Sequence, residues 1–240
     1  MKIVLRIKRF NPEKDGRPHD KDYALEVEPT DRILDALMKV QNEQDGSLSF
    51  RRSCGHGVCG SDAMIINGVE RLACKTLVRD VAREENTIIT VAPLKYMPVQ
   101  KDLMVDQGAF FEKYRAVRPF LINDEPVQEK ERIQSATERA AFDDSTACIL
   151  CGSCYSSCPI LESVSGYLGP AALVQAARFV FDSRDKGMPD RIAVLDDPRD
   201  GAWACENHFN CQRVCPREIK VTKNINALKR AITRSKEAGV

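Results

Sequence analysis

Apolar and polar residues alternate near the start of the chain, as they do in a half-buried β-strand. Residues 2–9 and 23–27 both follow this two-residue period, and the largely polar stretch between them contains two prolines and a glycine. That combination predicts a β-hairpin. Residues 64–66 and 88–91 are short apolar runs that predict two more strands, and Asn67-Gly68, directly after the first of them, is a turn signal.

A helical period replaces the alternation after residue 30. Its positions are Ile33, Leu34, Leu37, Met38 and Gln41. Thr30 or Asp31 stands where an N-cap residue would begin this helix. A strand pair, a helix and returning strands follow one another in the order of a β-grasp fold, which we assign to residues 1–97 because Pro93 and Pro98 mark a boundary.

Beyond this boundary the apolar period becomes helical, and no segment alternates convincingly as a strand. Four segments carry the helical period: residues 101–115, 129–141, 170–183 and 221–236. Gly169-Pro170 predicts a sharp start for the third of them, because proline is tolerated at the first position of a helix. The sequence therefore predicts an α+β protein, in which an all-α domain at residues 98–240 follows the β-grasp domain.

Charge and hydropathy restrict the class of partner. The 240-residue chain has 36 Lys and Arg against 35 Asp and Glu, so it gives no reason to expect nucleic acid as a partner. No run reaches the roughly 18 apolar residues of a membrane-spanning helix, and the strand-like N-terminus lacks signal-peptide and transit-peptide character. We therefore expect no transmembrane segment and a cytoplasmic location. Because thiols stay reduced in the cytoplasm, the ten cysteines in their clustered spacings are interpreted as metal ligands and not as disulfides.

Cysteine spacing carries the most specific functional information. One run reads C-x2-C-x2-C-x3-C-P, the pattern that holds a cubane iron–sulfur cluster in bacterial-type ferredoxins; its residues are Cys148, Cys151, Cys154, Cys158 and Pro159. A second run has the same frame with His208 in place of its second cysteine, and comprises Cys205, Cys211, Cys215 and Pro216. The chain is therefore expected to transfer electrons.

The two runs are expected to share their ligands, because the fourth cysteine of each run serves the other cluster in two-cluster ferredoxins. This rule assigns a [4Fe–4S] cluster to Cys148, Cys151, Cys154 and Cys215. The remaining thiolates, Cys158, Cys205 and Cys211, fit a [3Fe–4S] cluster, because a cubane without its fourth cysteine tends to lack the corresponding iron. His208 as a fourth ligand remains an alternative. A structural zinc site is disfavoured, because zinc is typically bound by four ligands in two separated pairs.

A third motif lies in the β-grasp domain. Its residues are Cys54, Cys59, Asp62 and Cys74, the plant-type ferredoxin frame for a [2Fe–2S] cluster with aspartate at the third ligand. Glycines in this loop let the backbone curl around a cluster and direct N–H groups at its sulfurs. An alternative remains in which Asp62 only caps a turn, and Ser61 or a water molecule provides the missing ligand to iron. A Rieske centre is disfavoured, because Cys74 has no histidine partner. The two domains are thus predicted to be of plant-type and bacterial-type ferredoxin kinds.

The chain resembles a known family in several motifs. These are both cysteine runs, Asn67-Gly68, Phe50-Arg51-Arg52-Ser53-Cys54, Val58-Cys59-Gly60-Ser61-Asp62, Leu168-Gly169-Pro170-Ala171 and Asp182-Ser183-Arg184-Asp185. They span nearly the whole chain and are similar to those of the iron–sulfur subunit of succinate dehydrogenase, respiratory complex II. In that family an aspartate sometimes replaces the third [2Fe–2S] cysteine, which favours Asp62 as a ligand.

The resemblance implies partners and a location. The chain would bind a flavoprotein subunit that carries FAD and a membrane anchor that binds quinone, and would lie peripherally on the cytoplasmic side of a bacterial inner membrane. Electrons would pass from flavin through [2Fe–2S], [4Fe–4S] and [3Fe–4S] clusters to quinone. Pro159, Ile160 and His208 flank the [3Fe–4S] ligands and are therefore expected near the quinone.

Two departures from the family concern that quinone. The tryptophan pair that ubiquinone-reducing relatives have after the first Cys-Pro is absent, and Glu206 stands where they place a histidine. Menaquinone, or the fumarate-reducing direction, therefore becomes an alternative, and a quinol:fumarate reductase subunit shares every cluster motif. A free-standing ferredoxin carrier is a third alternative, which the near-neutral charge and the large helical domain disfavour. The sequence leaves direction, quinone type, potentials and oligomeric state open.

Overall fold

The computed structural model describes residues 1–126 and 128–238 of the chain. The chain divides into two compact units. The first comprises Met1–Gln107 with Ile149–Ser157, and the second comprises Gly108–Cys148 with the chain from Cys158 onward. The sequence-based boundary between residues 97 and 98 stays a prediction. Within the described residues, no helix combines the length and the apolar character needed to cross a membrane.

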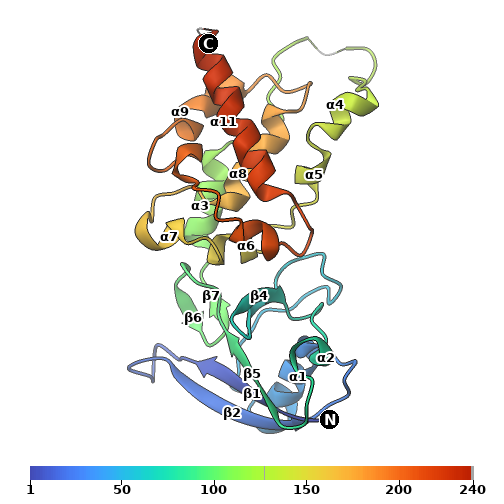
Figure 1. Cartoon of the computed structure of the whole chain (residues 1–240), viewed down its shortest axis with the longest axis vertical. Coiled ribbons are helices and arrows are strands. Elements are labelled where there is room, and N and C mark those ends of the chain that lie inside the picture. The colour runs from blue at the N-terminus through green and yellow to red at the C-terminus, as the bar shows by residue number, and fades with distance from the viewer. Residues whose placement is uncertain (127, 239–240) are drawn as a thin grey trace. The chain divides into compact units, whose positions relative to one another are not determined.

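The first unit is built on a five-stranded sheet with the order β2-β1-β5-β3-β4 (Figure 1). Its strands are β1 (Lys2–Arg9), β2 (His19–Glu26), β3 (Ala63–Ile66), β4 (Val69–Leu72) and β5 (Thr87–Ala92). β1 and β5 run parallel, whereas the β1–β2, β3–β4 and β3–β5 pairs are antiparallel. Asn67 and Gly68 join β3 to β4 with positive φ angles of 49° and 76°, as the turn signal predicts.

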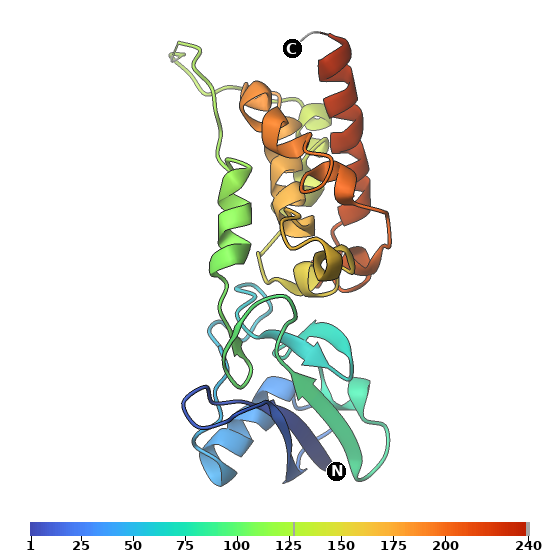
Figure 2. The same cartoon turned by 90° about the vertical axis from the view of Figure 1, so that its left-hand side faces the viewer.

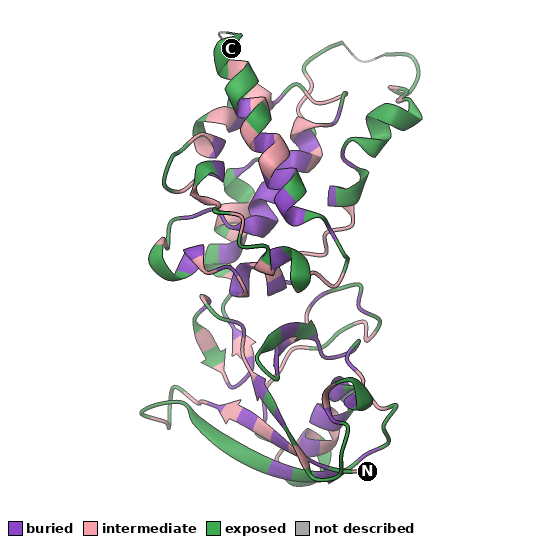
Figure 3. Ribbon diagram, viewed as in Figure 1, coloured by how far each residue is buried: buried purple, intermediate pink, exposed green. Residues whose placement is uncertain are grey.

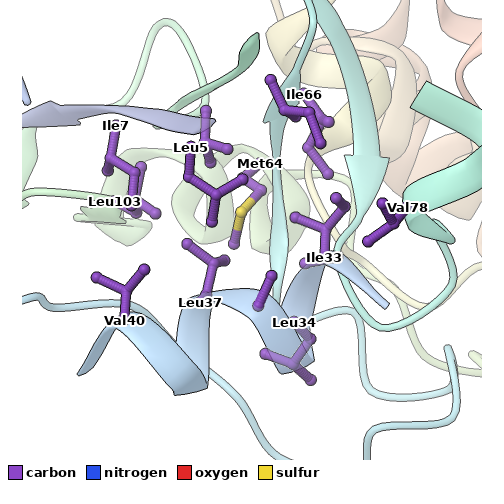
Figure 4. Close-up of a cluster of buried hydrophobic side chains, with 14 of the residues drawn as sticks. Leu5, Ile7, Ile33, Leu34, Leu37, Val40, Met64, Ile66, Val78 and Leu103 are labelled. Atoms are coloured by element: carbon purple, nitrogen blue, oxygen red, sulfur yellow. The ribbon is translucent and has the colours of Figure 1, made fainter. Parts of the chain in front are cut away.

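One face of this sheet is covered by α1 (Ile33–Lys39), which continues as a π-helical turn, η1 (Val40–Gln44); α2 (Val78–Val81) is a single turn. Figure 4 shows Leu37 of α1 pointing toward Leu5 of β1 and Met64 of β3, all of which are buried. The predicted N-cap is wrong, because Arg32 precedes the helix and its backbone N–H donates to Asp35 Oδ2 at 3.0 Å.

The helix predicted for residues 101–115 begins later than expected. The structure has a small hairpin of β6 (Val99–Lys101) and β7 (Met104–Val105), and α3 starts only at Gly108 (Gly108–Ala116). The reason is tertiary: the buried Asp102 carboxylate accepts hydrogen bonds from the Arg9 guanidinium at 2.9 Å and from the backbone of Phe10 and Ser49. These long-range bonds anchor the segment in a conformation that its local period does not indicate.

Helices form the second unit, and α8 (Pro170–Val180) lies beside α11 (Val221–Glu237) in both views of the cartoon (Figures 1 and 2). α8 is buried along almost its whole length (Figure 3). The shorter elements around them are α4 (Ala136–Ala140), α5 (Asp143–Thr146), α7 (Ile160–Ser163), α9 (Met188–Leu195), η2 (Ala202–Ala204) and α10 (Asn210–Arg213). α6 (Ser153–Ser156) belongs to the first unit.

The structure confirms one of the helix starts predicted in this unit and moves another. Pro170 occupies the start of α8 as predicted. The helix predicted for residues 129–141 is wrong over its first part, since α4 begins after Ser135, whose side chain accepts from the Glu138 N–H while the Glu138 carboxylate accepts from the Ser135 backbone. The predicted α+β class, a β-grasp unit and a helical unit, is confirmed.

Candidate iron–sulfur centres

The loop from Cys54 to Asp62 places two thiols side by side. Backbone N–H groups of His56 and Cys59 both donate to Cys54 Sγ at 3.3 Å, and the Cys54 N–H approaches Cys59 Sγ at 3.5 Å. Positive φ angles at three glycines of the loop make this curl possible. The loop therefore already has the N–H donors around sulfur that the sequence predicted for a [2Fe–2S] cluster.

Asp62 is the member of this motif whose role the sequence left open. The carboxylate is only 3% exposed. Its Oδ2 accepts from the Cys74 N–H at 2.5 Å, while its Oδ1 is buried without a hydrogen-bond partner. A buried carboxylate oxygen without a partner is costly, and an iron ligand would remove that cost. The residues present therefore fit a cluster that takes Asp62 as a ligand together with Cys54, Cys59 and Cys74.

The thiols of the motif differ in acidity. Hydrogen bonds from the backbone of His56, then of Cys59, lower the pKa of Cys54 to about 6. Burial, then the neighbouring Asp62, raises the pKa of Cys74 to about 12. Iron binds thiolates, so the loop N–H groups favour the ligand form of Cys54, whereas Cys74 loses its proton only where a metal compensates the charge.

In the second unit three cysteines distant in sequence line one small cavity. They are Cys158, which lies before α7, Cys205, which follows η2, and Cys211 on α10. Burial raises the pKa of Cys158, and burial also raises that of Cys211 to about 11. Thr222 Oγ1 lies 4.0 Å from Cys211 Sγ. The structure thus brings together the three residues predicted to hold the [3Fe–4S] cluster.

Pro159, Ile160 and His208, predicted to lie near quinone, line the same cavity. His208 is exposed, and its Nε2 lies 3.2 Å from Glu206 Oε2. Lys229 Nζ donates to the Cys205 carbonyl at 2.7 Å. Charged and titratable groups therefore surround this end of the second unit.

The remaining cysteines are assigned by spacing alone. Cys151 and Cys154 belong to the first unit, and Cys148 and Cys215 to the second. Their joint role as [4Fe–4S] ligands stays a prediction. Across the residues that the structure describes, no three His, Cys, Asp or Glu side chains are arranged to hold a single metal ion.

Sequence reasoning missed two hydroxyl groups beside the cysteines predicted to hold the [3Fe–4S] cluster. Tyr167 and Thr222 both line the cavity and are both buried. Tyr167 directly precedes the Leu168-Gly169-Pro170-Ala171 motif, which could have drawn attention to it. Thr222 lies in the first turn of α11, a segment whose periodicity indicates only a helix.

Family models match both halves of the chain. A 2Fe-2S iron-sulfur cluster binding domain matches residues 4–112, and a 4Fe-4S dicluster domain matches residues 144–219. Over almost the full length, the chain is 37% identical to the succinate dehydrogenase iron-sulfur subunit of Coxiella burnetii, covering 99% of this chain and 100% of that protein. The chain belongs to the succinate dehydrogenase iron–sulfur subunit family.

Other relatives agree with this membership. The mitochondrial succinate dehydrogenase [ubiquinone] iron-sulfur subunit of Candida glabrata is 37% identical, with 95% of this chain and 90% of that protein covered. The fumarate reductase iron-sulfur subunit of Mycobacterium tuberculosis is 36% identical, with 96% of each covered. A chain of the Mycobacterium smegmatis Sdh1 complex in the apo form has a TM-score of 0.88 at 26% identity, covering 98% of this chain and 97% of that chain.

Membership in the succinate dehydrogenase iron–sulfur subunit family confirms the predicted function class. The chain is an electron-transfer subunit with a [2Fe–2S] and a [4Fe–4S] domain, and the family also carries a [3Fe–4S] cluster. The cavity lined by three cysteines in the second unit fits that third cluster. One of these relatives is named a fumarate reductase subunit, so fumarate reduction remains the alternative direction.

Proposed function

We propose that the chain conducts electrons between the FAD of a flavoprotein subunit and a membrane quinone. The observation that carries this proposal is the shared cavity. It is lined both by the proposed [3Fe–4S] cysteines and by the residues predicted to lie near quinone, Pro159, Ile160 and His208. A terminal one-electron centre must lie close to its acceptor, and a quinone bound beside Pro159, Ile160 and His208 would lie close to a cluster held by these cysteines.

The chain's own residues hold and insulate the centres. The proposed [2Fe–2S] ligands are Cys54, Cys59, Asp62 and Cys74; the proposed [4Fe–4S] ligands are Cys148, Cys151, Cys154 and Cys215; and the proposed [3Fe–4S] ligands are Cys158, Cys205 and Cys211. When bound, the clusters accept and pass on one electron at a time. The N–H groups of the first loop and the buried surroundings of Cys211 would affect how strongly the [2Fe–2S] and [3Fe–4S] centres hold that electron.

The proposed setting is a complex on a membrane. A flavoprotein subunit would bind the first unit and an anchor the second, and the complex would lie on the cytoplasmic side of a bacterial inner membrane. Support comes from the named subunits among the relatives, each of which is one part of a larger enzyme by its name.

Succinate oxidation is the direction we propose, with fumarate reduction as the second candidate. Glu206 beside His208 favours the second, because a carboxylate stands where ubiquinone-reducing relatives place a histidine, and the M. tuberculosis relative is named a fumarate reductase subunit. The carboxylate of Glu206 lies 3.2 Å from the His208 Nε2, so it adds a hydrogen-bond acceptor and a negative charge at the residue predicted to lie near quinone.

One experiment tests the proposal as a whole. The native complex is purified from membranes, its bound quinone is extracted and identified, and its rates of succinate oxidation and fumarate reduction are compared. Co-purification with a flavoprotein and detergent-requiring partners, together with faster succinate oxidation, is the expected result. A chain that remains soluble without partners would support a free ferredoxin carrier, and faster fumarate reduction with menaquinone bound would reverse the direction.

A further inference from the structure

Tyr167 carries a hydroxyl group that is buried beside the proposed [3Fe–4S] cysteines. The side chain is fully buried, and its phenolic oxygen has no hydrogen-bond partner among the described residues. The same side chain lines the cavity of Cys158, Cys205 and Cys211. These thiols therefore face a buried donor that has nothing else to bind.

The backbone on both sides fixes the position of this ring. The Tyr167 N–H donates to the Val164 carbonyl at 3.1 Å, and the Leu168 N–H donates to the Asp200 carbonyl at 2.8 Å. Pro170 then starts the buried helix α8. The phenol is thus held at the cavity by the fold rather than by its own hydroxyl.

A buried hydroxyl without a partner is destabilising, so native structures rarely keep one without a reason. The phenolic O–H is a hydrogen-bond donor, and the cavity that it lines offers the sulfurs of Cys158, Cys205 and Cys211. Thr222, the other buried hydroxyl of the cavity, already lies beside Cys211 Sγ.

We propose that the Tyr167 hydroxyl donates a hydrogen bond to a sulfur of the [3Fe–4S] cluster and thereby raises the reduction potential of that cluster. The proposal rests on the ligand set proposed above. One electron enters the cluster on reduction and leaves on oxidation, while the phenolic proton stays on Tyr167 in both states. The hydrogen bond is stronger to the reduced cluster because that form carries one more negative charge, and so it favours reduction.

Tyr167→Phe in the assembled complex removes the hydroxyl and keeps the ring. EPR-monitored redox titration should show the [3Fe–4S] signal at native intensity and a lower midpoint potential. We expect roughly a threefold to tenfold fall in the ratio of reduced to oxidised cluster at a fixed poise, where tenfold corresponds to about 59 mV for a one-electron couple. The [2Fe–2S] potential, measured in the same titration, should not change.

Tyr114→Phe is the matched control, because it removes a phenol from α3 of the same unit at a position that does not line the cavity. It should leave both potentials unchanged. A Tyr167→Phe cluster that assembles with a native potential would overturn the inference, as would an equal shift of the [2Fe–2S] potential. A wild-type complex without any [3Fe–4S] signal would instead refute the proposed cluster set.

A second measurement decides the case if Tyr167→Phe fails to assemble the cluster. Incorporation of 3-fluorotyrosine makes every phenol a stronger donor without changing the packing appreciably, so the [3Fe–4S] potential should rise in the wild-type sequence. An unchanged potential in the fluorinated protein would overturn the inference. If Tyr167→Phe does assemble, fluorination should have no effect on its [3Fe–4S] potential.

Discussion

Gly60 lies directly against Cys151: a Cβ added to Gly60 would come 2.6 Å from the Cβ of Cys151 and 2.9 Å from its Cα. The glycine belongs to the loop of the proposed [2Fe–2S] ligands, and the cysteine is a proposed [4Fe–4S] ligand in the same compact unit. The loops of the two proposed cluster sites therefore meet at a point where a side chain on residue 60 does not fit.

Gly60→Ala should displace this contact. The Cβ would meet the backbone of Cys151, which cannot move aside as a flexible side chain can, so we expect lower iron content, an altered EPR spectrum of the reduced protein and a lower Tm. Gly57→Ala is the control. Both glycines have a φ of 71°, so both variants carry the left-handed backbone cost of about 1–2 kcal/mol, but the atoms nearest to a Cβ at Gly57 belong to the flexible Lys75 side chain. Equal damage in the two variants would contradict the importance of the Cys151 contact.

Asp62→Cys should retain the [2Fe–2S] cluster with a shifted potential, because thiolate is softer than carboxylate and donates more charge. Asp62→Ala should weaken the cluster, since the buried oxygen available to iron disappears. EPR spectra and redox titration of the reduced protein measure both effects. Ser61→Ala is the control for the alternative ligand: a change in that variant with none in Asp62→Ala would assign the ligand to Ser61.

His208→Cys restores the cysteine that the second run lacks. We expect conversion of the [3Fe–4S] centre to [4Fe–4S] with a lower potential, because a fourth thiolate can bind the missing iron. Anaerobic iron analysis and loss of the EPR signal of the oxidised [3Fe–4S] cluster measure the conversion. Four irons at this site in the unaltered, anaerobically prepared protein would show that the three-cysteine assignment is wrong.

His208→Ala should lower quinone-linked turnover and spare electron transfer to a dye that accepts electrons upstream. The exposed imidazole lies at the proposed quinone face and can donate a hydrogen bond or relay a proton there. Roughly tenfold loss with a quinone analogue corresponds to about 1.4 kcal/mol in the barrier. His19→Ala, on a strand of the first unit, is the control. Equal loss in both assays, or none, removes His208 from quinone chemistry.

Asp45→Asn should destabilise the first unit at neutral pH. Burial opposes ionisation of Asp45, but hydrogen bonds from Lys21, Ser47, Tyr23 and Arg9 outweigh it and hold the pKa below its usual range. Losing the charged acceptor should cost about 2 kcal/mol. Because the folded pKa is lowered, the wild-type advantage is complete above the unfolded carboxyl pKa of about 3.9 and diminishes as pH falls below it.

Apparent Tm values of the assembled protein, measured from neutral pH downward at a fixed scan rate, check this dependence. Asp22→Asn is the control, because the Arg6–Asp22 pair on β1 and β2 is largely exposed and should matter little. A Tm difference between wild type and Asp45→Asn that grows on acidification would contradict the assignment.

The sequence by itself determined which residues are available as ligands and which elements have a local cause. Cysteine spacing needs no tertiary information, because ligands of one cluster loop lie a few residues apart. The β1–β2 hairpin and the start of α8 were likewise predictable, since alternation, a polar turn and a proline at the first helical position act over short range.

Only the tertiary structure decided which distant groups meet. The β6–β7 hairpin replaces a predicted helix because Arg9, more than ninety residues earlier, binds Asp102. Tyr167 and Thr222 join Cys158 and Cys205 at one cavity although their separations in the chain follow no period. Local periodicity depends only on residues close in the sequence. Whether a buried polar atom such as Asp62 Oδ1 or the Tyr167 hydroxyl has a hydrogen-bond partner depends on which distant residues the fold places beside it.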